Sequence, residues 1–174
     1  MHYRTGFRFA VAALLVLLAT PAASADLSME DFAREAAALN LFQIRSSTLA
    51  VEKGMKDETR ALAREILAVH KNAQQDLVAA AKAEEVPTLQ KMNDEQGSKL
   101  NALEQAPARD FDAAYMSAQI STYAAIGRLY QGFIKSGEAG RLHTIAETTY
   151  PQMHMMETRV TAQSSPGPVT DGED

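Results

Sequence analysis

Apolar residues recur at intervals of three and four over long stretches of this chain, and this spacing limits what the chain can fold into. Between residues 26 and 163 there are three prolines, and valine and isoleucine are scattered instead of alternating with polar residues. Alanine, leucine, glutamate, lysine and glutamine dominate the same region. Such a composition with a helical period is typical of amphipathic helices. The sequence therefore predicts an all-α fold.

Local start and stop signals divide this pattern into five helices. Ser28 with Asp31 three residues later forms an approximate capping box, and Gly54 is expected to end the first helix. Pro87 is expected to end the second helix because proline lacks an amide hydrogen. Pro151 is expected to kink or split the last helix. The expected helices cover residues 28–54, 57–86, 93–105, 110–137 and 138–163.

Four long amphipathic helices and a short one most simply form an up-and-down bundle. The short third helix can then be part of a longer crossover between the second and third long helices. That is the connection that ferritin-like bundles use. A plain antiparallel bundle is the competing arrangement. In either case we expect residues 26–163 to form one helical domain.

The first 25 residues have the composition of a secretory signal. Arg4 and Arg8 give a positive start, residues 9–19 are an unbroken apolar run of 11, and residues 23–25 are Ala-Ser-Ala. A membrane span needs about 20 apolar residues, so the run is too short to be an anchor. We expect cleavage after Ala25 and a periplasmic or secreted chain, with no membrane span after cleavage. Residues 164–174, which are rich in proline, glycine and acids, are expected to be a disordered acidic tail.

Charge and cysteine content exclude several classes of protein. The full chain has 17 basic and 22 acidic residues and no cysteine. Cleavage after residue 25 would remove two arginines, leaving 149 residues with a net charge of −7. We therefore expect no disulfide, zinc finger or lipid-anchored cysteine, and no binding to nucleic acid, which needs a basic surface. Partners are otherwise unknown at this level, and a homo-oligomer is possible.

The motifs of common enzymes are missing. The chain has no nucleotide-binding glycine loop, no Gly-x-Ser-x-Gly and no His-Glu-x-x-His. Di-iron bundles place a glutamate three residues before a histidine on two helices. Here Leu67, Gly140 and Pro151 occupy the positions three residues before the histidines of the expected domain. We therefore expect no enzymatic activity.

Two regions remain as candidate sites. His70 follows Ile66 by four residues at the edge of the second helix's apolar stripe, so it is either a hydrogen-bonded core histidine or a ligand. On an unbroken helix His143, Glu147 and His154 would share one face and are candidate ligands for a divalent metal. Pro151 interrupts this helix before His154, so the alternative is a solvated or tail-packing face. Met153, Met155 and Met156 surround His154, and such soft donors suit copper. Met153 and Met156 also fit the apolar stripe, which favours core packing.

The chain resembles a bacterial family of predicted secreted or outer-membrane proteins of unknown function with a ferritin-like four-helix fold. The resemblance covers about residues 31–163. It rests on the following residues: Phe32, Ala36, Ala37, Leu49 and Ala50; Val69, His70 and Leu77; Phe111, Asp112, Tyr115 and Met116; and the Tyr150-Pro151 step.

The resemblance implies an inward glutamate on the first helix and inward histidines on the three others, as in a remnant metal site. Only His70 matches; Gln43, Tyr123 and Met156 stand at the other positions. We therefore expect Gln43, His70 and Tyr123 to form a hydrogen-bonded polar cluster in the core. The leading hypothesis is an exported, non-catalytic binding or envelope-stress protein without a cofactor. The alternative is a periplasmic ferritin-like protein that binds iron, copper or zinc.

Overall fold

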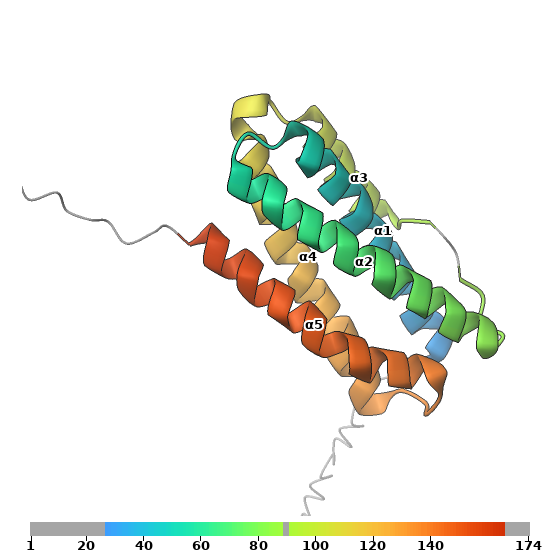
Figure 1. The fold of residues 1–174 in the computed structure, drawn as a ribbon. Coiled ribbons are helices and arrows are strands. Elements are labelled where there is room, and N and C mark those ends of the chain that lie inside the picture. The colour runs from blue at the N-terminus through green and yellow to red at the C-terminus, as the bar shows by residue number, and fades with distance from the viewer. Residues whose placement is uncertain (1–26, 89–90, 166–174) are drawn as a thin grey trace, which may run out of the picture.

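The computed structural model describes residues 27–88 and 91–165, which form five helices and no strand (Figure 1). The helices are α1 (Met29–Lys53), α2 (Asp57–Ala83), α3 (Asp94–Gln105), α4 (Ala108–Ser136) and α5 (Arg141–Ser164). The all-α prediction is confirmed. The expected signal peptide, and all but the first two residues of the expected tail, lie outside the described residues.

The four long helices surround a common core. α1 contacts α2 and α4, and α5 contacts the same two helices, so α2 and α4 face each other across the centre. Successive helices α1 and α2 are joined by a short turn, as are α4 and α5, and each pair runs antiparallel (Figure 1). An ion pair between Arg159 and Glu65 shows that the end of α5 lies beside the start of α2.

The short helix α3 carries the chain from the end of α2 to the start of α4. Near its start, Asn93 donates a hydrogen bond to Glu35 of α1 at 3.3 Å. Near its end, the carbonyl of Glu104 accepts one from Lys53 at 2.8 Å. These contacts join the start of α3 to the start of α1, and the end of α3 to the end of α1. The helix α3 therefore runs alongside α1 in the same direction. The α2–α4 connection therefore spans the length of the bundle.

Local caps set three of the helix boundaries. Ser28 precedes α1 and accepts a hydrogen bond from the Asp31 amide at 3.0 Å. Asn93 precedes α3 and accepts one from the Gln96 amide at 3.0 Å. Gly54 follows α1. The side-chain oxygens of Ser28 and Asn93 satisfy amides that have no partner within the helix, and the amide of Gly54 donates to the carbonyl of Ala50. Because these contacts are local, the sequence predicted these boundaries closely.

Carboxylates from other helices set two further boundaries. Asp112 of α4 accepts hydrogen bonds from the amides of Met55 and Lys56, at 3.0 and 2.9 Å, in the α1–α2 turn. Glu84, at the end of α2, accepts one from the amide of Arg141. The start of α5 at Arg141, three residues later than expected, coincides with this contact.

Pro151 lies inside α5, which continues as one helix on both sides of it. Of the two expected outcomes, a kink or a split, the split is wrong. Pro151 is on the exposed face, so the hydrogen bond that it cannot donate is missing on the side that water reaches.

The core is built from aromatic and small side chains. Phe32 stacks on Phe133 with ring centroids 4.1 Å apart and meets the ring of Tyr130 edge-on at 5.2 Å. Met153 and Met156 are buried, which agrees with core packing, whereas Met155 is 51% exposed. Burying one large apolar side chain contributes about 1.5–3 kcal/mol, so the contacts of Phe32 with Tyr130 and Phe133 help to hold α1 against α4.

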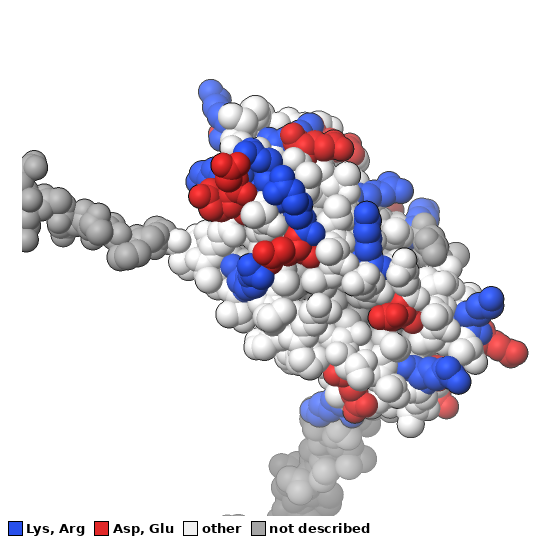
Figure 2. Space-filling view, in the orientation of Figure 1, with Lys and Arg blue, Asp and Glu red and all other residues white. Residues whose placement is uncertain are grey.

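Charged residues of both signs are mixed on the face seen in Figure 2, and they are sparse along α5. No helix within the described part of the chain is long and apolar enough to cross a membrane.

Candidate functional site

His70 lies in the centre of the bundle with no exposed surface. Its Nδ1 is 2.8 Å from Oδ1 of Asn40 on α1, and its Nε2 is 3.1 Å from the hydroxyl of Tyr123 on α4. An amide oxygen can only accept, so Nδ1 carries the proton and donates it. Nε2 is then free to accept from the Tyr123 hydroxyl. Both ring nitrogens are therefore held by uncharged protein groups.

Burial keeps this group of side chains neutral. Burial lowers the pKa of His70 from 6.5 to about 3, because the charged imidazolium loses its water. The same loss of hydration raises the pKa of Tyr123 far above 10, with a smaller contribution from Tyr115. At neutral pH the Tyr123–His70 pair therefore has no net charge.

Further polar side chains continue from His70 along the α1–α4 interface. Ser47 and Tyr115 share a hydrogen bond of 2.9 Å between their hydroxyls. Gln119 donates to Ser46 at 3.2 Å. All are buried between helices. We call this set the polar column, and it comprises Asn40, Gln43, Ser46, Ser47, His70, Tyr115, Gln119 and Tyr123.

The structure brings together two members of the expected cluster and adds a different third. His70 meets Tyr123, but Asn40 takes the place expected for Gln43. Gln43 is fully buried, and neither polar atom of its side chain has a hydrogen-bond partner among the described residues. Asn40 precedes Gln43 by about one helical turn on the same face, so the helical period was the signal that could have identified it.

The candidates on α5 form two separate pairs. Nδ1 of His143 is 3.6 Å from Oε2 of Glu147, and its Nε2 is 3.0 Å from the carbonyl of Ile134. Nδ1 of the exposed His154 is 3.3 Å from Oε2 of Glu157. Eleven residues of helix separate the two histidines by about 16 Å along the axis, so they cannot share one ion.

The polar column does not fit a divalent metal. Iron, zinc and similar ions are held in bundle cores by carboxylates and histidines. The column offers one histidine, whose two nitrogens already have protein partners, together with amides and hydroxyls. Within residues 27–88 and 91–165, no three histidine or acidic side chains come together as a possible metal site.

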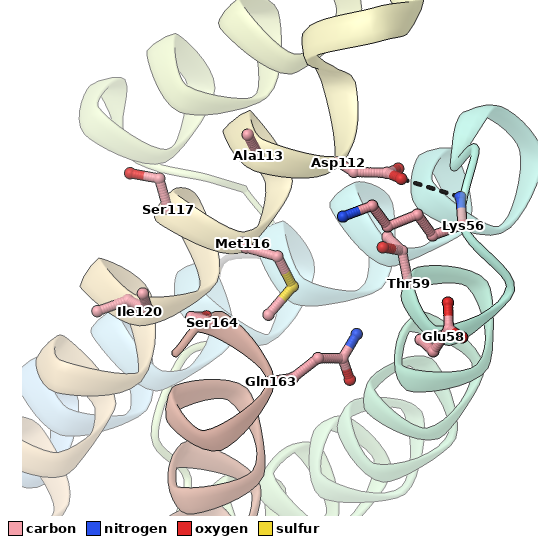
Figure 3. A pocket seen from close by; sticks show the side chains of 10 residues that line it. All are labelled: Lys56, Glu58, Thr59, Asp112, Ala113, Met116, Ser117, Ile120, Gln163 and Ser164. Carbon is pink, nitrogen blue, oxygen red and sulfur yellow. Dashed lines mark hydrogen bonds between the residues drawn. The ribbon is translucent and has the colours of Figure 1, made fainter. Parts of the chain in front are cut away.

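A surface hollow of about 540 Å³ lies where the α1–α2 turn, the start of α4 and the end of α5 meet (Figure 3). Lys56 and Glu58 line it from the α1–α2 side, and Met116 and Gln163 extend into it from α4 and α5. Asp112 also lines the hollow, but its carboxylate is engaged by the amides of Met55 and Lys56. No sequence motif marks this hollow, because its lining comes from three distant segments.

Comparison with known families assigns the chain. The family described as Domain of unknown function (DUF4142) matches residues 17–162. The chain belongs to this DUF4142 family. The expected resemblance to a family of unknown function is thus confirmed, and all five helices except the last residues of α5 lie within the matched region. No curated protein and no solved structure matches the chain.

Proposed function

We propose that this DUF4142 chain is an exported ferritin-like bundle that acts by binding and not by catalysis, with a role in the cell envelope. In this proposal the ancestral position of a metal site is occupied by the neutral polar column. The observation that carries the proposal is the state of His70. Both of its ring nitrogens are used by Asn40 and Tyr123, and no carboxylate of the described residues bonds to it.

The arrangement of the helices supports the ferritin-like part of the proposal. Two antiparallel pairs, α1–α2 and α4–α5, pack against each other, and the connection between them spans the bundle through α3. A single long crossover of this kind distinguishes ferritin-like bundles from plain up-and-down bundles.

The amino-terminal sequence supports export. Its two arginines, apolar run and Ala-Ser-Ala segment match a signal that is removed after Ala25. Expression of the full chain, followed by mass spectrometry of the protein from the periplasm or medium, tests this. A mature chain that begins at Asp26 is expected, and an uncleaved chain retained in the cytoplasm would contradict export.

Metal analysis tests the absence of a metal centre. The exported chain is purified without a tag, and iron, copper and zinc are measured per chain for the wild type, His70→Ala and His143→Ala. We expect far less than one metal atom per chain in all three proteins. A stoichiometric metal that is lost in His70→Ala overturns the proposal.

A metal-binding role at His143 is the second candidate. Nε2 of His143 donates to the carbonyl of Ile134, so Nδ1 is the ring nitrogen that remains for a metal. Nδ1 lies 3.6 Å from Oε2 of Glu147, which places an imidazole nitrogen and a carboxylate oxygen side by side. Stoichiometric metal that is lost in His143→Ala but kept in His70→Ala would favour this candidate.

A further inference from the structure

We propose that the polar column is a hydrated site, in which ordered water molecules bind between α1 and α4 and complete the hydrogen bonds of Asn40, Gln43 and Gln119. This inference concerns the same interior as the proposed function and rests on its being free of metal. It goes beyond the proposed function by identifying water as the ligand that the polar column binds.

Four buried amide atoms of the column have no hydrogen-bond partner among the described residues. They are Nδ2 of Asn40, Nε2 and Oε1 of Gln43, and Oε1 of Gln119. All three side chains are at most 2% exposed. Buried polar atoms in folded proteins nearly always have a partner, either protein or ordered water. Three of the four atoms lie within about one turn of α1, and the fourth belongs to Gln119 of α4, which bonds to Ser46 of α1.

Turning the amides over does not remove the unpartnered atoms. If the Asn40 amide were reversed, its nitrogen would donate to Nδ1 of His70 and its oxygen would lose its partner. If the Gln119 amide were reversed, its oxygen would accept from Ser46 and its nitrogen would be left without a partner. Asn40 and Gln119 each form a hydrogen bond through only one of their two amide atoms, so the other atom is unpartnered in both orientations.

The chemistry of the column selects water over an ion. Gln43 and Asn40 offer donors, and Gln43 and Gln119 offer acceptors, so the ligand must both donate and accept. No charged side chain belongs to the column, and His70 is neutral. A bound cation or anion would therefore lack a counter-charge in a region of low dielectric constant.

Small polar side chains occupy this level of α1. Ser46 and Ser47 occupy buried positions of α1, whereas Leu39 and Phe42 occupy buried positions in the two preceding turns. Water in protein interiors typically makes about three hydrogen bonds to such polar groups. Toward the end of the bundle, Tyr115 lies one residue from Met116, which lines the surface hollow (Figure 3). That end of the column is therefore the one nearest to the hollow along α4.

Nuclear magnetic resonance of the intact wild-type protein tests the proposal directly. Metal analysis of the same sample is done first, so that a failure of the metal-free proposal is recognised separately. We expect cross-relaxation from long-lived water to the side-chain NH₂ groups of Asn40, Gln43 and Gln119. The absence of such water contacts at all three groups would overturn the proposal.

The stability of a Gln43 variant gives an independent test, because bound water and no ligand predict changes of opposite sign. Gln43→Met keeps the length of the side chain and removes both polar atoms. If water bridges Gln43, the variant removes hydrogen-bond partners of that buried water. The equilibrium constant for unfolding should then rise about fivefold or more. If Gln43 has no ligand, the variant removes two unsatisfied atoms, and the constant should fall.

Gln75→Met, at an exposed position of α2, is the matched control and should change the constant less than twofold. A fall in the unfolding constant of Gln43→Met below that of the control would overturn the proposal. If Gln43→Met does not fold, Gln119→Met is measured in the same way, and the water contacts of the wild type still decide.

Discussion

The hydroxyl of Tyr123 lies 3.1 Å from Nε2 of His70, at the centre of the bundle. These residues belong to α4 and α2, the two helices that face each other diagonally. Asn40 adds a bond from α1 at 2.8 Å, so one imidazole ties three of the four long helices together. A directional contact of this kind fixes the relative positions of helices that apolar packing alone would leave freer to slide.

His70 and Tyr123 should therefore be energetically coupled. His70→Leu leaves Asn40 and Tyr123 without a buried partner, and Tyr123→Phe leaves Nε2 without one. We expect each variant to lower the free energy of unfolding by about 1–3 kcal/mol. The double variant should lose less than the sum, with a coupling of about 0.5–3 kcal/mol. Urea unfolding of the four proteins measures this, and strict additivity would mean that the bond contributes nothing.

Stability should fall on mild acidification because of His70. Its pKa is about 3 in the folded chain, against 6.5 as the ordinary value. Between these values the unfolded chain binds a proton that the folded chain does not, so stability is greatest above pH 6.5 and declines below it. Between pH 7 and 5 the wild type should lose about 2 kcal/mol more than His70→Leu. Parallel losses in the two proteins would contradict burial of the neutral ring.

Asp112 should be more important for stability than its neighbour Asp110. Asp112→Ala removes the acceptor for the amides of Met55 and Lys56 and should cost about 1–2 kcal/mol. Asp110→Ala, at an exposed position in the first turn of the same helix, is the control and should cost about 0.5 kcal/mol or less. Thermal unfolding distinguishes them, and equal losses would argue against the cap.

Two glycines should respond to alanine in opposite directions. At Gly137 an added Cβ would collide with the carbonyl and the ring of Phe133, which stacks on Phe32. Gly137→Ala should therefore destabilise the protein by about 1–3 kcal/mol. At Gly97 in α3 no atom lies within 4 Å of an added Cβ. Gly97→Ala should stabilise by about 0.5–1 kcal/mol, because alanine favours the helix. Calorimetry of both variants checks the signs.

The sequence predicted features that depend on neighbouring residues. Ser28 and Asn93 act within one turn of their own helices, so those boundaries could be placed without knowledge of the fold. The start of α5 could not, since Glu84 reaches it from another helix. Likewise, the periodicity placed His70 near the buried stripe. Whether His70 bonds to Asn40 or to Gln43 depends on how α1 and α2 are aligned, which the sequence does not show. The surface hollow has lining from three segments and no local signature.

The nitrogen-15 resonances of the His70 ring test the central claim most directly. We predict a neutral ring with the proton on Nδ1, unchanged between pH 7 and 5 and unchanged when Zn²⁺ or Fe²⁺ is added in excess. Titration of the ring near its ordinary pKa, or a shift of either nitrogen on addition of metal, would contradict a neutral histidine held by Asn40 and Tyr123.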